Sequence, residues 1–263
     1  MFFETLWELV TSSKYWGTIL EGFYTTVIIA CGAAVLGLAL GIIVAVVKIA
    51  AKKNKKLKFF EVICDLYVSI IRGTPVALQL FILAFGILTI RGFPLEITAI
   101  IAFGINSGAY VAESLRGGIQ SVDAGQDEAA RSLGLSGMQS MRYIIVPQAI
   151  KSVIPAIGNE LIALLKETSI VSMIGITDLT FAAKIIGAGH ELANYLVPML
   201  FVALFYLAVV YLLIFFIRMI ERHFQQSEQH ADERKLEKCR IRMEKRLRAI
   251  DERYMKECTN GEN

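Results

Sequence analysis

The sequence predicts an all-α, polytopic membrane protein with about five transmembrane helices, and three observations indicate this fold class. Apolar residues make up 55% of the 263 residues and charged residues only 19%, whereas soluble proteins usually carry about 25% charge. Mean hydropathy is +0.56. The charge is also uneven, because residues 218–263 hold 12 of the 27 Lys and Arg residues. Most of the chain is therefore suited to lipid, and a polar tail follows it.

Five apolar stretches approach the length of roughly 20 residues that a helix needs to cross about 30 Å of hydrocarbon. They are residues 22–47, 59–90, 94–115, 153–176 and 192–217. The second stretch is interrupted at Arg72-Gly73-Thr74-Pro75. There we expect the helix to stop and restart inside the membrane, with Thr74 as the N-cap and Pro75 as the first residue.

Three domains follow from these stretches. The transmembrane domain is expected over residues 17–220, between an interfacial N-terminal segment at 1–16 and a charged, helical tail at 221–263. Cytoplasmic loops are rich in Lys and Arg, and such residues gather after the first, third and fifth stretches. All three segments lie on one side only if the N-terminus is outside and the C-terminus is in the cytoplasm.

The segment between the third and fourth spans, about residues 120–150, is expected to form two short helices. Asp127 is a candidate N-cap of the first helix, and Gly134 suits the left-handed position that ends it. Ser136 opens the second helix with a capping box, and we expect this helix to end at Pro147. Such a hairpin is suited to docking a soluble partner, although an amphipathic loop at the lipid headgroups would have the same pattern.

This segment resembles the EAA loop, the signature of the membrane subunits of bacterial ATP-binding-cassette importers. Glu128-Ala129-Ala130 is followed at the expected spacing by Gly134, Ile144 and Val146-Pro147, with Val146 where the motif usually has Leu. Other segments resemble the polar amino acid branch of these permeases, namely 71–75, 110–113, 116–119, 125–126 and 164–169. The resemblance covers about residues 17–220 and leaves out the tail.

The resemblance implies a MetI-like permease fold and the ATP-driven import of a polar amino acid across the bacterial cytoplasmic membrane. It implies a second permease subunit in a homodimer or heterodimer, two ATPase subunits and an extracytoplasmic solute-binding protein. It assigns coupling to the ATPase to Glu128, Ala129, Ala130, Gly134 and Pro147. The sequence has no Gly-Lys dipeptide and therefore no P-loop. We expect ATP on the partner subunit, no cofactor on this chain and no enzymatic activity.

Polar residues inside the expected spans are the candidate substrate groups, because charges within a bilayer are expensive and usually functional. The free N–H groups of the restarted helix would attract an anionic group. In the third span, Asn106, Tyr110 and Glu113 share one helix face, and Asn159 and Lys166 share a face of the fourth. The full substrate-binding prediction is Arg72, Gly73, Thr74, Gln79, Asn106, Ser107, Glu113, Lys166 and Glu167.

Other interpretations remain open from the sequence. Arg72 would also suit a kinked helix in which its side chain extends to the interface, and Lys166 would suit a structural ion pair with Glu113. The same architecture would serve another small solute, such as methionine or a small anion. A membrane-anchored signalling or scaffold protein would act through the charged tail instead, and an ion channel would need no ATP. The His and Cys residues lack metal-ligand spacing, and no basic block alternates with aromatic residues, so neither a metal nor a nucleic acid is expected.

Overall fold

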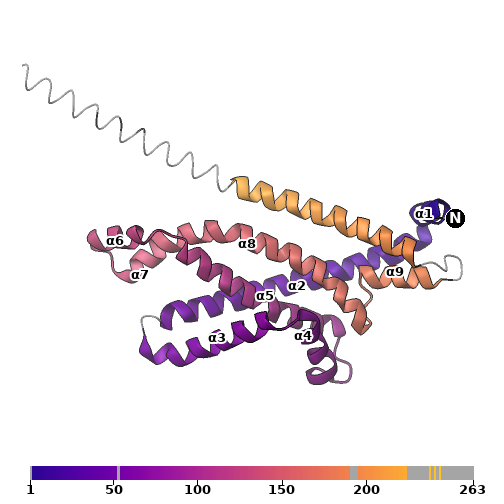
Figure 1. Ribbon diagram of the computed structural model, residues 1–263, viewed down its shortest axis with the longest axis horizontal. Coiled ribbons are helices and arrows are strands. Elements are labelled where there is room, and N and C mark those ends of the chain that lie inside the picture. Colours follow the sequence, from indigo (N-terminus) through magenta and orange to yellow (C-terminus); the bar gives the residue numbers. More distant parts are fainter. Residues whose placement is uncertain are drawn as a thin grey trace, which may run out of the picture. The chain divides into compact units, whose positions relative to one another are not determined.

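The computed structural model describes residues 2–51, 54–189 and 195–223, with three further positions at 237, 240 and 243 (Figure 1). The helical tail predicted for residues 221–263 therefore lies almost entirely outside the described residues. The chain divides into two compact units, Met1–Phe215 and Phe216–Asn263. All contacts described below lie within the first unit.

The described residues are helical apart from short connections, and no strand occurs among them. The α-helices are α1 (Phe2–Thr11), α2 (Ser13–Ala51), α3 (Lys58–Gly73), α4 (Val76–Ile82), α5 (Leu95–Gln120), α6 (Ala124–Ser132), α7 (Gly137–Ser140), α8 (Val146–Glu167) and α9 (Leu179–Ala188). Short 3₁₀ segments lie at Lys55–Leu57 and Thr168–Ile174, and π-helical turns at Leu83–Ile87 and Met141–Ile145. A last helix covers Leu196–His223.

Four helical stretches in the described part of the chain are long and apolar enough to cross a membrane. They are Ser13–Ala51, Leu95–Gln120, Gly137–Ile174 and Leu196–His223. The pair Lys58–Gly73 and Val76–Ile87 makes a fifth if it counts as one span, bent by 107°. The prediction of about five spans and an all-α fold is confirmed.

The second span breaks before Pro75, as predicted, but the residue that occupies the N-cap position of α4 differs from the prediction. Thr74 does not cap α4, because its hydroxyl donates backward to the carbonyl of Ile70 at 2.9 Å. Pro75 occupies the N-cap position, and Thr74 is extended with φ −123° and ψ 146°. A residue before proline is pushed out of the helical region, which explains why α3 ends at Gly73.

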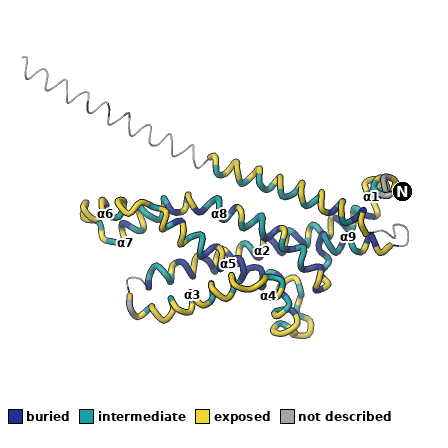
Figure 2. The backbone as a smooth tube through the Cα atoms, viewed as in Figure 1, coloured by how far each residue is buried: buried dark blue, intermediate teal, exposed yellow. Residues whose placement is uncertain are grey.

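The contact between α2 and α5 forms the centre of the first unit, and small residues make it close. A Cβ atom on Gly37 would lie 2.7 Å from Ser107, and one on Gly41 would lie 2.5 Å from Val111. Phe103, fully buried on α5, joins the hydrophobic core that also includes residues of α2, α4 and α8. Figure 2 shows this buried centre in dark blue, while the outer faces of the helices are exposed.

Close contacts also join α8 to α5 and α9 to α2. A Cβ atom on Gly118 of α5 would lie only 2.2 Å from Val153 of α8, so α5 and α8 meet closely near their junction with the loop. Asp178 is fully buried and caps α9 by accepting from the N–H groups of Thr180 and Phe181, each at 2.9 Å. The N–H of the next residue donates to Thr26 of α2 at 3.2 Å, which joins α9 to α2.

Candidate functional site

Gln79 organises the break between α3 and α4. Its side-chain nitrogen donates to the carbonyl of Ile71 and to the hydroxyl of Thr74, each at 2.8 Å. Its side-chain oxygen accepts from the amide of Asn106 on α5 at 3.0 Å. A backbone group freed by the break is thereby satisfied within the chain, and the break is joined to the centre of α5.

Glu113 lies about two helical turns after Asn106 on α5, and cationic side chains from three helices surround its carboxylate. Its carboxylate accepts from Arg116 on the same helix at 2.7 Å. It lies 3.5 Å from Arg72 at the end of α3 and 3.7 Å from Lys48 near the end of α2. The Arg72 guanidinium also lies 5.3 Å from the centre of the Tyr110 ring. The predicted shared face of Asn106, Tyr110 and Glu113 is confirmed, because all three side chains contact residues of α3 or α4.

We define the break network as Arg72, Thr74, Gln79, Asn106, Tyr110 and Glu113, which includes five of the nine predicted substrate-binding residues. Gly73 lies at the edge of this network, and a Cβ atom there would meet no atom within 4 Å. Ser107 lies on a different side of α5, against Gly37 of α2. Its hydroxyl is buried, and the half-buried Glu160 of α8 lies close enough to interact with it.

The alternative that paired Lys166 with Glu113 is wrong. Arg116, Lys48 and Arg72 surround Glu113 instead, and the exposed Lys166 makes no ion pair within the described part of the chain. The rotation of α8 explains this difference. Its buried residues include Val153, Gly158, Leu164 and Leu165, so Asn159 and Lys166 face outward. Glu167 is half-buried and lies beside Lys166, apart from the break network.

Three charged residues next to the break network were not among the predicted site residues. Lys48 Nζ lies 2.7 Å from the Asp65 carboxylate, and Arg116 is the main partner of Glu113. One signal was available, because Asp65 and Arg72 are seven residues apart on α3 and therefore share a helix face. A hairpin between α2 and α3 then brings Lys48 opposite that face.

The predicted coupling loop contains the helix α6 and the short helix α7. Gly134 has φ +84°, the left-handed conformation that glycine adopts most easily. Its N–H donates to the backbone carbonyl of Arg131 at 2.9 Å, and the N–H of Leu135 donates to the backbone carbonyl of Ala130 at 3.1 Å. These two bonds form a Schellman motif. They confirm the predicted helix stop at Gly134.

The start of α6 differs from the prediction. Asp123 is the N-cap and accepts from the N–H of Gly125 at 2.6 Å, so the helix begins at Ala124, about one turn before the expected start. Asp127 instead accepts from Arg131 at 2.9 Å and from the buried Ser140 hydroxyl of α7. It therefore stabilises the inside of the loop.

The second loop helix does not end at Pro147, contrary to the prediction. The predicted capping box at Ser136 is present, but a π-helical turn at Met141–Ile145 leads directly into α8. Pro147 lies in the first turn of α8, where a missing N–H is tolerated. The loop is consequently continuous with the fourth span over Gly137–Ile174.

The outer surface of the loop is partly apolar. Glu128 and Ala129 are exposed, whereas Ala130 is 1% exposed and packs inside the loop. Of the two alanines predicted to couple to the ATPase, only Ala129 is therefore accessible to a partner. Leu133 is 82% exposed, and the exposed Met138 and Tyr143 belong to the same loop. Large apolar residues on an otherwise polar loop mark an interaction surface.

Comparison with known proteins agrees with this architecture. Residues 37–226 match the family described as "Binding-protein-dependent transport system inner membrane component". The arginine transport system permease protein ArtQ of Bacillus subtilis (strain 168) is 40% identical over 212 residues, which cover 80% of this chain and 94% of ArtQ.

Solved structures show the same fold. One is described as the "Crystal structure of an amino acid ABC transporter with histidines", and it matches with a TM-score of 0.74 and 37% identity over 82% of this chain and 98% of that one. The inward-facing MetNI methionine ABC transporter matches with a TM-score of 0.66 over 81% of this chain and 98% of that chain, at 20% identity. This likeness confirms the MetI-like fold alone.

The family decides between several of the functions that the sequence left open. A membrane component of a binding-protein-dependent system is a non-catalytic, multi-pass subunit that works with an ATPase and a binding protein. This favours a transporter over an anchored scaffold or an ion channel. The chain belongs to the family of inner membrane components of binding-protein-dependent transport systems.

Proposed function

We propose that this chain is the permease subunit of an importer that moves a polar amino acid across a bacterial inner membrane. One observation supports this proposal most directly. The break network places a guanidinium, a carboxylate and two amides at a helix break between apolar helices, with Arg72 and Glu113 only 3.5 Å apart. An amino acid offers the complementary groups, because its carboxylate suits Arg72 and its ammonium suits Glu113.

The geometry also indicates how a solute would enter. The Arg72–Glu113 distance of 3.5 Å is longer than the 2.7 Å contact between Glu113 and Arg116. A zwitterion would therefore separate Arg72 from Glu113 while Arg116 keeps the carboxylate oriented. Gln79 and Asn106 would then form hydrogen bonds with the polar side chain of the amino acid solute, since amides both donate and accept hydrogen bonds.

The proposed assembly contains a second permease subunit, identical or different, two ATPase subunits and an extracytoplasmic binding protein. In the proposed orientation, the N-terminus lies outside and the lysine-rich segment after α2 faces the cytoplasm. The outward-facing Asn159 and Lys166 of α8 would contact the second permease subunit or the solute that passes between the two. ATP would bind the ATPase subunits, and this chain would hold no cofactor.

The coupling loop would transmit ATPase closure to the membrane. Its exposed surface contains Glu128, Ala129 and Leu133, and its second helix continues into α8. A push on the loop would therefore move a membrane-spanning helix directly. Gly134 maintains the sharp stop between the two loop helices.

Reconstituted transport tests the substrate proposal. The permease, its ATPase and its binding protein are placed in vesicles, and ATP-dependent uptake of labelled arginine, glutamine, methionine and phosphate is measured for each solute in turn. Arginine or glutamine uptake that falls at least about tenfold in Gln79→Leu, matching the loss of a buried hydrogen-bond network, supports the proposal. Uptake of methionine or phosphate alone would identify a different solute and reject it.

The coupling assignment has a separate test. Gly134→Trp forces a bulky residue into a left-handed position, so we expect ATP hydrolysis to continue while uptake is lost. Gly92 offers a matched control, because it also has a positive φ of +84° but lies in the turn before α5. Gly92→Trp should reduce stability without separating hydrolysis from uptake. Normal ATP-dependent uptake by the Gly134→Trp complex would refute the coupling role.

A further inference from the structure

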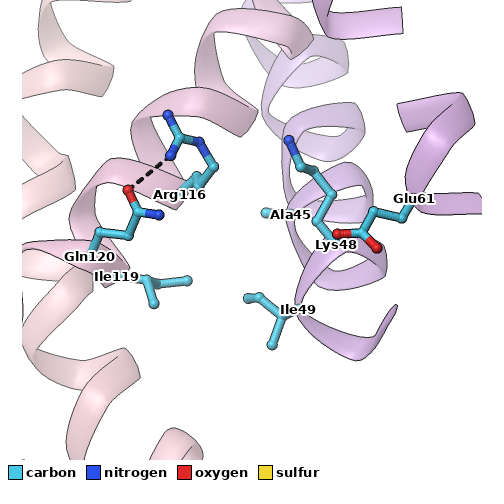
Figure 3. Close-up of a pocket in the computed structure, with 7 residues that line it drawn as sticks. All are labelled: Ala45, Lys48, Ile49, Glu61, Arg116, Ile119 and Gln120. Carbon is cyan, nitrogen blue, oxygen red and sulfur yellow. Dashed lines mark hydrogen bonds between the residues drawn. The ribbon is translucent and has the colours of Figure 1, made fainter. Parts of the chain in front are cut away.

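A hollow lies where the ends of α2 and α5 meet the first turn of α3 (Figure 3). Two of its lining residues, Lys48 and Arg116, contact the Glu113 carboxylate. The space between the lining residues of the hollow is about 420 Å³ and is open to solvent. Its aliphatic walls are formed by Ala45, Ile49 and Ile119, and its charged lining is formed by Lys48, Glu61 and Arg116. The two cations come from different helices and the anion from a third.

The hollow lies at a boundary of the membrane. Lys48 is the first charged residue after 26 uncharged residues of α2, a stretch that spans about 39 Å as a helix. The hydrocarbon core is only about 30 Å thick, which places Lys48 at the level of the lipid headgroups. Five more lysines follow in the sequence before residue 59. A molecule in the hollow therefore meets both the headgroups and the parts of the acyl chains nearest to them.

Hydrogen-bond donors remain available on both cations. A guanidinium has five N–H donors, and Arg116 uses them on Glu113 and on the Gln120 side chain at 2.8 Å. Two of its N–H groups therefore remain. The Lys48 ammonium has three N–H donors. One is directed at Asp65 at 2.7 Å, while Glu113 at 3.7 Å is beyond hydrogen-bond distance. An anionic group between the two side chains would accept hydrogen bonds from both cations.

Glu61 presents the opposite charge to the same space. Its side chain reaches from the first turn of α3 toward α2 (Figure 3), and it makes no ion pair with any described residue. A carboxylate beside aliphatic walls is best stabilised by a cation that donates hydrogen bonds. The hollow thus combines a place for an anion, a place for an ammonium group and an apolar surface.

We propose that the hollow binds phosphatidylethanolamine. Its phosphate accepts from Lys48 and Arg116, its primary ammonium donates to Glu61, and an acyl chain covers Ile49 and Ile119. Basic pockets between transmembrane helices are known sites for lipid headgroups. A choline headgroup has no N–H donor for Glu61, and a glycerol headgroup has no positive charge. The selectivity for ethanolamine therefore depends on Glu61.

A free amino acid carries the same pair of charges, but it has no chain to cover the aliphatic walls. The phospholipid accounts for the whole lining, including Ala45, Ile49 and Ile119. Lys48 and Arg116 of the hollow also contact Glu113 of the break network. The proposed lipid uses their remaining hydrogen-bond donors together with Glu61, so this inference does not depend on which solute the permease carries.

Lipid titration of the complete transporter tests the proposal. The permease–ATPase complex is stripped of lipid in mild detergent, and synthetic phosphatidylethanolamine, phosphatidylcholine and phosphatidylglycerol are added in turn. Native mass spectrometry then measures how much of each lipid stays bound. Because one charge-assisted hydrogen bond separates the ethanolamine and choline headgroups, we expect about tenfold tighter retention of phosphatidylethanolamine.

Two variants, each with a matched control, locate the lipid. Glu61→Gln should reduce phosphatidylethanolamine retention to the level of phosphatidylcholine. Glu96→Gln is the matched control. Glu96 is an exposed glutamate in the first turn of α5 and so matches the position of Glu61 in the first turn of α3, but it lies outside the lining of the hollow. Ile119→Trp should fill the hollow and reduce the retention of both lipids. Val46→Trp, at a 57% exposed position of α2 outside the lining, should change neither.

The outcomes that overturn the proposal are specific. Equal retention of phosphatidylethanolamine and phosphatidylcholine by the unchanged complex would remove the role of the ammonium group. Unchanged selectivity in Glu61→Gln would place the lipid elsewhere. Displacement of bound phosphatidylethanolamine by millimolar arginine or glutamine would identify the hollow as a solute site. Glycerophosphoethanolamine, the headgroup without acyl chains, should bind far more weakly, and equal binding would exclude a role for the aliphatic walls.

Discussion

The membrane-spanning helices hold two groups of polar residues, and they differ in how their charges are compensated. Around Glu113, the carboxylate has cations from α2, α3 and α5 within 2.7 to 3.7 Å. On α8, Asn159 and Lys166 are exposed, and Lys166 has no ion pair within the described residues. Within one permease chain, the charge of Glu113 is therefore compensated by neighbouring cations, whereas Lys166 has no ion-pair partner.

This difference indicates which parts of the permease work alone and which need a partner. A charge in lipid is expensive unless it is paired. Lys166 lies near the half-buried Glu167 without forming an ion pair with it, so we expect a group from another molecule to complete its environment. The second permease subunit or a passing solute would supply it. The Glu113 carboxylate is already compensated within the chain by Arg116 and Lys48. We expect these contacts to join α2 and α5 throughout transport, while Arg72 separates from Glu113 when a solute binds.

The largest effect on stability should come from Glu113→Ala. This change leaves Arg116, Arg72 and Lys48 without their shared anion. Breaking a fully buried pair costs about 3–5 kcal/mol, and we expect about 2–3 kcal/mol here because the Glu113 side chain is 19% exposed. The melting temperature of the purified permease–ATPase complex should fall by several degrees. A loss no larger than that of Lys166→Ala would contradict the comparison.

The adjacent glycines of α5 offer a sharper and somewhat smaller test. Gly118→Ala would place a Cβ atom 2.2 Å from Val153, whereas Gly117→Ala would meet no atom within 4 Å. Overpacking of this kind costs about 1–3 kcal/mol. Gly117→Ala should instead stabilise the helix by about 0.5–1 kcal/mol. Thermal unfolding of both variants measures the difference, and equal melting temperatures would show that α5 and α8 do not pack closely here.

The same contact shows where sequence reasoning succeeded and where it stopped. Helical periodicity alone predicted that Asn106, Tyr110 and Glu113 share a face, because that relation lies within one helix. The pairing of Glu113 depended on how α8 is rotated against α5. The close approach of Gly118 and Val153 sets that rotation, and no periodicity in either helix specifies it. The sequence consequently suggested Lys166 as a partner of Glu113 where the structure has Arg116.

In the coupling loop too, local features were predictable from the sequence, whereas features that depend on contacts between helices were not. Gly134 was predictable, since a glycine between two helical segments is the usual end of a helix. Asp123 and Asp127 are both good N-cap residues, and the choice between them depends on contacts across the loop. Asp127 is drawn inward by Arg131 and by Ser140 of α7. Asp123 is therefore left to cap α6.

The smallest effect on stability, and the most direct test of the comparison, should come from Lys166→Met. An exposed, unpaired residue contributes little to the fold, so we expect the stability of the single permease chain to change by less than about 0.5 kcal/mol. A double-mutant cycle between Glu113 and Lys166 should give a coupling energy within about 0.5 kcal/mol of zero.

The corresponding cycle between Glu113 and Arg72 should give about 1 kcal/mol, because those two side chains are 3.5 Å apart and partly screened. Uptake should nevertheless fall in Lys166→Met, since the group that normally meets this ammonium comes from outside the chain. A substantial Glu113–Lys166 coupling energy would mean that the two polar groups meet within one permease chain, and α8 would then have to rotate during transport. Unchanged uptake together with zero coupling would instead assign Lys166 to the lipid boundary and leave the Glu113 cluster as the polar centre of the permease.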